Sequence, residues 1–396
     1  MTEKLYYSDG HLANFTAKVL SCTEENGRYA VVLDRTAFFP GGGGQDADEG
    51  ELGGMRLLGL REDGEEIIHL VPGALQPGAE VEGKLDWPLR FGRMQGHSGE
   101  HILSGTVHRL FGCDNVGFHM GAEGMTIDFS AELSREDLSR AELEANRAIW
   151  RNLPVRTLLP GPEKLHAMEY RSKKELSGEV RIVEIEGVDR CACCAPHVSR
   201  TGEVGVLKII DSMRHRGGTR LTLICGEAAL RDYQELHANN ARVSASLSAK
   251  RLETGAAIER HLAEQEERKA ELTRLKRELL QLKAARLERT EGCICIFEED
   301  MDMITLRELV NAGAELAGIA CAGFTGRDGD YKYIIGSRTK ALRSMTKEIN
   351  AAIEGRGGGS DAMLQGTSRE RDNRTVFRIL EKLNQPGHIE VTRQFY

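Results

Sequence analysis

The chain has 396 residues, of which 40% are hydrophobic and 29% are charged. That length exceeds one ordinary domain, so we expect two or three domains, each able to form a core. The sequence holds neither the roughly 18 consecutive apolar residues of a membrane span nor an N-terminal signal-like run. We therefore expect a cytoplasmic protein with no membrane partner. The net charge of −8 argues against a general nucleic-acid coat, although local basic clusters can still contact phosphates.

Residues 1–90 have the pattern of a small β-barrel or sandwich. Short apolar runs lie at 19–22, 29–33, 55–61 and 65–71. The first pair flanks Asn26-Gly27 and the second flanks Asp63-Gly64, two dipeptides typical of β-hairpin turns. Between the pairs, residues 35–50 include four consecutive glycines, which can adopt backbone angles that other residues rarely reach. This segment predicts a glycine-rich β-domain.

The pattern changes after Trp87-Pro88, and we expect an α+β domain over residues 91–227. Apolar side chains recur at helical spacing over 94–111 and stop at Gly112. A second helix is expected from Ser134 to about Trp150, with Asp137 completing an imperfect capping box. Strands are expected at 180–185, 204–210 and 220–225, with a basic loop over 214–218 between the last two.

Residues 228–290 predict a helical linker, because this segment has no proline and one glycine over most of its length. The 3-4-3-4 spacing of four leucines and one arginine is typical of a coiled-coil seam: Leu272, Leu275, Leu279, Leu282 and Arg286. A long helical hairpin fits equally well, since the leucine spacing is looser before that point. Either arrangement would make the segment a spacer or the arm of a homodimer.

Residues 291–396 predict a small α/β domain, in which strands alternate with helices. The expected strands lie at 293–297, 318–324 and 331–336, and the expected helices at 302–316 and 341–354. A second glycine-rich loop is expected over 355–368. The predicted fold class is therefore α+β with several domains: a β-barrel, an α+β domain, a coiled-coil linker and a C-terminal α/β domain.

Two pairs of potential metal ligands have the same four-residue spacing. His97 and His101 project from one face of the expected helix, and Cys193 and His197 follow about a hundred residues later in CCAPH. Three imidazoles and one thiolate form a plausible tetrahedral set for Zn²⁺. Nine cysteines, three of them crowded at 191–194, also fit reduced thiols and a metal site better than a disulfide framework.

Other interpretations of these residues stay open. Cys191 and Cys194 form a C-x-x-C pair that could replace Cys193 or act in redox chemistry, although no second such pair completes a zinc ribbon. HSGEH also matches H-x-x-E-H, the motif of inverted zinc peptidases, in which Glu100 would be the general base. Such peptidases need a further carboxylate ligand. Here CCAPH offers a thiolate and an imidazole instead.

HSGEHILSG, followed by RCACCAPHVSRTGEVG, resembles the editing domain of alanyl-tRNA synthetases and of the free-standing AlaX proteins. TAFFPGGGGQ resembles the glycine-rich stretch of that family, and GTRLTLICG resembles its closing strand. The stretch RGGGSDAMLQGTS resembles the glycine motif of the DHHA1 domain, which would make 291–396 DHHA1-like. The similarity covers nearly the whole chain in order, with no aminoacylation domain ahead of it, as in the long form of AlaX.

The resemblance implies roles for individual residues. It makes His97, His101, Cys193 and His197 the zinc ligands, and Thr36 the hydroxyl that recognises a serine side chain. The substrate's aminoacylated end would lie against a wall formed by Gly41, Gly42, Gly43, Gly44 and Gln45. Where the family has Gly-Gly-Thr between the Cys and the His, this chain has Cys194-Ala195-Pro196. The ligand spacing is kept, whereas a threonine hydroxyl is lost and a thiol gained near the metal.

The implied activity is ATP-independent deacylation of misacylated tRNA(Ala), chiefly Ser-tRNA(Ala) and also Gly-tRNA(Ala). A second site that hydrogen-bonds the serine hydroxyl discriminates where an apolar pocket cannot. Four protein ligands would fill a tetrahedral zinc, so the coordination expands, one ligand leaves to allow water activation, or zinc only positions the substrate. The alternatives are a tRNA-binding or oligomerisation protein with structural zinc, and the H-x-x-E-H peptidase. Candidate tRNA contacts are Lys332, Arg338, Lys340, Arg343, Lys347, Gly357, Gly358 and Gly359.

Overall fold

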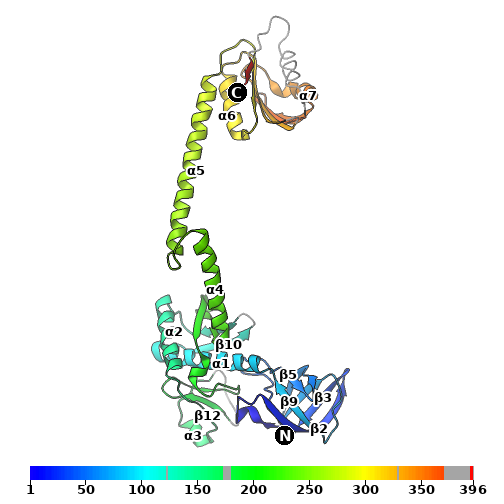
Figure 1. Ribbon diagram of the computed structural model, residues 1–396, viewed down its shortest axis with the longest axis vertical. Coiled ribbons are helices and arrows are strands. Elements are labelled where there is room, and N and C mark those ends of the chain that lie inside the picture. The colour runs from blue at the N-terminus through cyan, green and yellow to red at the C-terminus, as the bar shows by residue number, and fades with distance from the viewer. Residues whose placement is uncertain (122–123, 173–179, 328–329, 370–392, 396) are drawn as a thin grey trace. The chain divides into compact units, whose positions relative to one another are not determined.

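The computed structural model describes residues 1–121, 124–172, 180–327, 330–369 and 393–395 (Figure 1). The chain divides into two compact units, Met1–Val243 and Ser244–Tyr396, each with its own contacts. The finer boundaries at 90, 227 and 290 stay predictions. Among the described helices, none combines the length and the apolar composition that a membrane span requires.

The N-terminal part is an antiparallel sheet in the order β6-β5-β9-β2-β3-β8-β7. Its strands are β2 (Asn14–Glu25), β3 (Arg28–Leu33), β5 (Gly50–Leu52), β6 (Met55–Arg56), β7 (Gly59–Asp63), β8 (Glu66–Val71) and β9 (Glu80–Leu85). Strand β1 (Glu3–Lys4) pairs in parallel with β4 (Arg35–Thr36). The 3₁₀ turn η1 (Leu5–Tyr7) follows β1 directly. Because β6 and β7 end the order without pairing to each other, the β-barrel is not confirmed.

Period-2 alternation produces the strands of this sheet. In β2, Phe15, Ala17 and Val19 are buried while the residues between them are exposed, so one face forms the core. The predicted Asn26-Gly27 turn is confirmed, since both residues have positive φ and Glu25 pairs with Arg28. The run expected at 55–61 is two strands, because β6 pairs with β5 and β7 pairs with β8.

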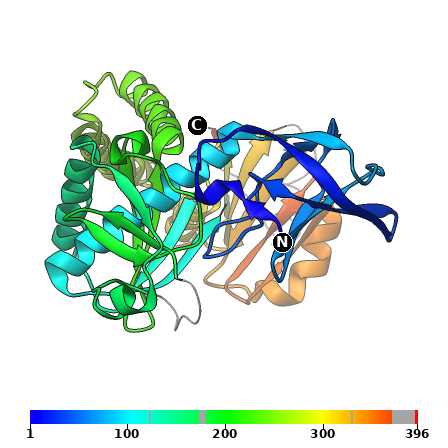
Figure 2. The ribbon, with the colours of Figure 1, turned by 90° about the horizontal axis from the view of Figure 1, so that it is seen from below.

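Helix α1 (Trp87–Phe111) is longer than the predicted 94–111. The Asp86 carboxylate accepts a hydrogen bond from the Leu89 amide as N-cap, and Pro88 occupies the first turn, where a missing N–H costs nothing. The Trp87-Pro88 boundary is therefore a helix start. The predicted end is confirmed at Gly112, whose φ is +66°. Figure 2 shows α1 in cyan, reaching from the green strands to the blue N-terminal strands.

Two further sheets and helix α2 (Arg135–Trp150) pack around α1. One sheet has the order β10-β11-β16-β15 and the other the order β12-β13-β14. The strands are β10 (Asn115–Gly121), β11 (Gly124–Phe129), β12 (Val155–Leu158), β13 (Ile182–Ile185), β14 (Asp189–Ala192), β15 (Leu207–His215) and β16 (Gly218–Cys225). Short helical turns α3 (Pro162–His166) and η2 (Thr201–Val204) join them. The capping box of Ser134 with Asp137 is confirmed.

Two helices occupy most of the predicted linker. Helix α4 (Gly226–Ser246) follows β16, and α5 (Thr254–Ala285) begins after a break at 247–253. The four seam leucines lie on α5 and are 48–65% exposed. Their exposure leaves a coiled coil as a prediction that the single chain does not confirm.

The second unit is an α/β domain with the sheet order β20-β21-β19-β18-β17-β22. Its strands are β17 (Cys293–Glu298), β18 (Ala320–Arg327), β19 (Asp330–Gly336), β20 (Gly355–Gly359), β21 (Met363–Ser368) and β22 (Arg393–Phe395). Helix α6 (Met303–Ala314) covers one face, and α7 (Leu342–Ala352) packs against the other. The segment expected as a loop at 355–368 is instead the β20–β21 hairpin.

Candidate metal centre

The structure brings together the four side chains predicted as metal ligands. His97 and His101 lie one turn apart on α1, and Cys193 and His197 lie in the loop after β14. Their ligand atoms are all within 4.8 Å of one another. The three histidines are 1–7% exposed and Cys193 is partly buried. Two segments about a hundred residues apart thus form one cluster that can hold a metal ion.

Each histidine of the cluster is oriented by an oxygen that faces its Nδ1 atom. The oxygen is Oε1 of Gln45 for His97 at 3.0 Å, Oδ2 of Asp189 for His101 at 2.9 Å, and Oγ of Ser98 for His197 at 3.0 Å. The opposite Nε2 atoms of His97 and His197 lie 3.6 and 3.3 Å from Sγ of Cys193. With the proton on each Nδ1, all three Nε2 lone pairs are available to a metal.

The carboxylate that orients His101 reaches it because α1 carries glycine one turn further on. A Cβ at Gly105 would lie 2.4 Å from the Val188 carbonyl oxygen and 2.7 Å from Cβ of Asp189. Glycine therefore lets β14 approach α1 closely enough for Asp189 to contact His101. Arg171 binds the same carboxylate through Nε at 2.7 Å and Nη2 at 2.9 Å. Asp189 is not among the predicted site residues, although it precedes CACC by only two residues.

The protonation states in the cluster suit a metal cation. Burial alone would raise the pKa of the Cys193 thiol, but the imidazoles of His97 and His197 hold that pKa well below its usual value. Burial lowers the pKa of His197 to about 3, which keeps its imidazole neutral. Burial alone would lower the pKa of His101, but its hydrogen bonds to Asp189 and Cys193 hold that pKa well above its usual value, so this ring gives up a proton when a metal binds. One thiolate with three imidazoles is a donor set that zinc accepts. The residues present therefore fit a zinc ion.

The neighbouring cysteines have different surroundings. Cys194 is exposed, and its Sγ lies over the glycine-rich turn rather than among the imidazoles. Cys191 is buried and forms a second group of potential ligands with His101 and Asp189. Burial raises the pKa of the Cys191 thiol, which disfavours the thiolate there. The geometry thus favours Cys193 as the sulfur ligand.

Glu100, the candidate general base, is buried on the α1 surface. Its Oε1 atom accepts hydrogen bonds from Oγ of Ser104 at 2.7 Å and from Nδ2 of Asn115 at 2.5 Å. Its Oε2 atom lies 3.9 Å from Nε2 of His101. The carboxylate therefore links β10 to α1 and is not exposed to solvent.

The hydroxyl of Thr36 is buried and already bonded. Its oxygen lies 2.8 Å from Nε2 of His69 and accepts a hydrogen bond from the Phe38 amide at 3.1 Å. Since Nδ1 of His69 faces the Val31 carbonyl oxygen at 3.2 Å, the ring donates there and accepts the Thr36 proton at Nε2. One lone pair of the Thr36 oxygen is left, so this hydroxyl could serve a substrate only as an acceptor.

Buried His69 predicts a pH-dependent stability. Burial lowers its pKa to about 4 in the folded chain, against 6.5 in the unfolded chain. Below pH 6.5 the unfolded state binds the extra proton, so the free energy of unfolding should fall with pH until about pH 4. The full loss is about 3 kcal/mol, at roughly 1.4 kcal/mol per pH unit. Urea unfolding between pH 7 and 4.5 should show a slope about 1.4 kcal/mol per pH unit smaller in His69→Gln than in the wild type, because buried His197 contributes to both proteins. Parallel curves for the two proteins would contradict the assignment.

The predicted substrate wall is a turn that only glycine can form. Gly41, Gly42, Gly43 and Gly44 have φ values of 94, 135, 62 and 89°. A Cβ at Gly44 would lie 2.5 Å from the ring of Phe118, and the Gly44 carbonyl accepts a hydrogen bond from the Met120 amide at 3.2 Å. The turn is thereby fixed against β10 at Gly44. The next residue is Gln45, whose side chain contacts His97.

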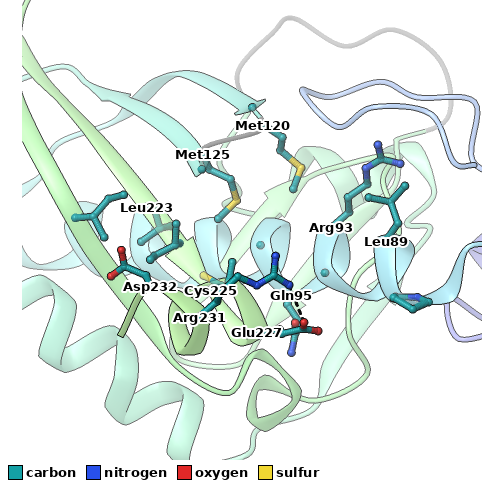
Figure 3. A pocket seen from close by; sticks show the side chains of 18 of the residues that line it. Leu89, Arg93, Gln95, Met120, Met125, Leu223, Cys225, Glu227, Arg231 and Asp232 are labelled. Atoms are coloured by element: carbon teal, nitrogen blue, oxygen red, sulfur yellow. Dashed lines mark hydrogen bonds and ion pairs between the residues drawn. The ribbon is translucent and has the colours of Figure 1, made fainter. Parts of the chain in front are cut away.

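A cavity of about 1010 Å³ runs along another side of α1 (Figure 3). Its lining includes apolar side chains, Met120, Met125, Leu223 and Cys225, and five carboxylates, Asp46, Asp86, Glu227, Asp232 and Glu235. Of its two arginines, Arg231 pairs with Glu227 at 2.8 Å and Arg93 lies 3.8 Å from Glu49. The excess of negative charge makes this cavity unsuitable for phosphates, and none of the four cluster side chains lines it.

The predicted tRNA contacts of the second unit do not share one face. Lys332 lies on β19 and points to the same side as Ile334, which packs against α6, whereas Arg343 and Lys347 lie on α7. Arg338 forms an ion pair with Glu315 at 2.6 Å, and Lys340 precedes α7 on the exposed surface.

In β20, Gly357 and Gly359 are needed for packing. A Cβ would lie 2.3 Å from Oη of Tyr333 at Gly357, and 2.0 Å from the Met363 carbonyl oxygen at Gly359. Gly358 faces open space.

Comparisons with known proteins agree with the motifs. Residues 180–222 match the family described as "Threonyl and Alanyl tRNA synthetase second additional domain". The chain is 29% identical to the alanyl-tRNA editing protein AlaX-L of Pyrococcus horikoshii, over 99% of this chain and 100% of that protein. It is 32% identical to the alanyl-tRNA editing protein Aarsd1 of Danio rerio, over 56% of this chain and 58% of that protein.

A larger class of relatives carries the same region. The chain is 30% identical to the alanine–tRNA ligase of Methanopyrus kandleri over 96% of its own length, but spans only 44% of that ligase. The C-Ala domain from the Aquifex aeolicus alanyl-tRNA synthetase aligns with 24% of this chain and 96% of that domain. Their identity is 17% and the TM-score is 0.22, too low to define a shared fold. The full-length match to AlaX-L and the matched synthetase domain support an AlaX-type alanyl-tRNA editing protein, as the motifs predict.

Proposed function

We propose that this protein is a trans-acting hydrolase that deacylates misacylated tRNA(Ala), chiefly Ser-tRNA(Ala) and also Gly-tRNA(Ala). The observation that carries the proposal is the cluster of His97, His101, Cys193 and His197 beside the glycine turn. The alanyl-tRNA editing proteins among its relatives support the substrate class. The bond broken is the ester between the amino acid and the terminal ribose.

The proposed cofactor is zinc, held by the four clustered side chains. When bound, zinc would polarise the ester carbonyl or bring the pKa of a water close to neutrality. The chain itself supplies the orientation, because Gln45, Ser98 and Asp189 fix the three imidazole rings. The open turn at Gly42 and Gly43 would admit the aminoacylated end. Selectivity for serine is assigned to the remaining lone pair of Thr36, as an acceptor of the serine hydroxyl.

The direct test measures release of amino acid from Ser-, Gly- and Ala-tRNA(Ala) by the zinc-loaded full chain. We expect serine to be released at least about a hundred times faster than alanine, and faster than glycine as well, because neither analogue has the hydroxyl that the site hydrogen-bonds. Release of alanine at the rate of serine would refute the proposed selectivity, and release of none would refute the deacylase.

A matched variant separates selectivity from catalysis in that assay. Thr36→Val should lower serine release about a hundredfold, because the hydrogen bond that it removes is the one to which the selectivity is assigned. Glycine release should hardly change, because glycine has no side chain for Thr36 to recognise. An equal fall for both substrates would assign Thr36 to the packing around His69 alone.

The two alternative functions have less support. Glu100 accepts hydrogen bonds from Ser104 and Asn115 within the protein, which disfavours its use as the free base of an H-x-x-E-H peptidase. A purely structural zinc would not require the open glycine turn beside the ligands. It remains the second candidate, in which the protein only binds tRNA or a second copy.

We propose that tRNA contacts in the second unit centre on one face of its sheet. Lys332 on β19 and Arg356 on β20 are both register partners of Thr367, on the strand between them. Their side chains therefore project from the same face of the sheet, roughly 10 Å apart. Among the described residues, neither has a carboxylate partner. Arg356 thus joins Lys332 as the leading phosphate contact. A homodimer through the α5 leucines, the DHHA1-like character of residues 291–396 and a cytoplasmic location stay predictions.

A further inference from the structure

Gln45 holds a buried hydrogen-bond donor that the folded chain does not use. The side chain is 3% exposed, and its Oε1 atom faces Nδ1 of His97 at 3.0 Å. Its Nε2 atom is buried and has no acceptor among the residues the structure describes. Buried amide donors are nearly always paired, because an unpaired one loses its hydration without compensation. This donor therefore requires an explanation.

The amide orientation follows from the chemistry of His97. Reversing the amide would place the NH₂ group against Nδ1, which would then have to accept, leaving the imidazole proton on Nε2. That Nε2 lies in the cluster, 3.6 Å from Sγ of Cys193, where a ligand needs its lone pair. Hence Oε1 accepts from His97, and the NH₂ group is the one left over.

The surroundings of Gln45 suggest where an acceptor would enter. Gln45 closes the glycine turn through two backbone hydrogen bonds with Gly42, of 2.9 and 3.1 Å. Gly42 and Gly43 are exposed, and a Cβ at either would lie 3.6 Å from Sγ of Cys194. Without side chains at Gly42 and Gly43, the turn is separated from Sγ of Cys194, next to Cys193, by the room of one Cβ contact. Gln45 is the last residue of this turn.

We propose that Gln45 is a catalytic residue whose Nε2 donates a hydrogen bond to the ester carbonyl oxygen of the bound aminoacyl-tRNA. The inference rests on the proposed deacylase function, with the substrate approaching the donor past the exposed Gly42 and Gly43 while Gly44 stays bound to β10. When the water oxygen adds to the carbonyl carbon, the π electron pair moves to the carbonyl oxygen, which Nε2 stabilises as an oxyanion. Re-formation of the C=O bond expels the ribose oxygen, which takes a proton from the water. The products are the free amino acid and tRNA.

The matched variants are Gln45→Glu and Gln45→Met. Glutamate keeps an oxygen to accept from His97 but loses the donor, whereas methionine loses both. We expect Gln45→Glu to hold zinc at the wild-type stoichiometry, to keep KM for Ser-tRNA(Ala), and to lose about 10²–10³ in kcat, as when an oxyanion-hole donor is removed. Gln45→Met should lose the same kcat and also bind zinc more weakly.

Each other outcome would overturn the assignment. If Gln45→Glu keeps zinc and kcat, Gln45 only positions His97. If Gln45→Glu loses zinc and activity together, Gln45 likewise acts only by orienting the ligand His97. Failure of the wild type itself to deacylate Ser-tRNA(Ala) would refute the proposed function. The wild-type measurement therefore distinguishes this outcome from the two outcomes for Gln45→Glu.

Discussion

Cys193→Ala is expected to lose its bound zinc and to deacylate Ser-tRNA(Ala) about 10³-fold more slowly than the wild type. The thiolate is the only anionic member of the cluster, and the Nε2 atoms of His97 and His197 lie within 3.6 Å of it. Its loss removes one of four donors and the negative charge that balances the cation. A metal contributes several kcal/mol to stabilising such a transition state, which corresponds to roughly this factor. Zinc content and kcat/KM of the purified full chain measure both effects.

The adjacent cysteines provide the controls for this prediction. Cys194→Ala removes an exposed thiol one residue away and should keep zinc and activity. Cys191→Ala tests the second group, with His101 and Asp189, and should also keep zinc if Cys193 is the ligand. Zinc retained by Cys193→Ala and lost by either control would contradict the assignment. A Cys193→Ala protein whose circular dichroism shows an unfolded chain would instead support the structural-zinc alternative.

The metal cluster could be predicted from sequence because each half of it is local. Four residues on a helix fix the relation of His97 to His101, and a short loop fixes that of Cys193 to His197. What joins the halves is not local. The contact of Asp189 with His101 depends on the close approach of β14 at Gly105, which no periodicity reports. The link from Gln45 to His97 likewise depends on a turn built from four positive-φ glycines.

The same distinction applies to the fold. The hairpin at Asn26-Gly27 and the capping box at Ser134 were predictable, since both depend on neighbouring residues. The β10–β11 hairpin was missed, because glycines and a register shift at 115–117 interrupt its alternation. Strand β20 was predicted as a loop, since glycine disfavours strands. Gly357 is instead required there, since a Cβ would lie 2.3 Å from Oη of Tyr333.

The second large effect is expected at a buried ion pair in the N-terminal unit. Arg90 and Asp48 are each about 1% exposed on their side chains, and Nε of Arg90 donates to the Asp48 carboxylate at 3.0 Å. The same guanidinium donates to the carbonyl oxygens of Ala37 at 2.6 Å and Gly10 at 3.1 Å. Asp48 also accepts from the Phe39 amide at 2.7 Å. Arg90, two turns before His97, thus binds the metal-ligand helix to the segments on both sides of the glycine turn.

Asp48→Asn should therefore lower the free energy of unfolding by about 3–5 kcal/mol, the cost of leaving one charge of a buried pair uncompensated. The exposed pair of Glu25 with Arg61, at 3.4 Å, is the matched control. Glu25→Gln should change stability by less than about 1 kcal/mol, because solvent screens such pairs. Urea unfolding of both zinc-loaded variants measures the difference, and equal midpoints would contradict it. Since Gln45 lies on the segment that Asp48 anchors, Asp48→Asn should also weaken deacylation in the fraction that stays folded.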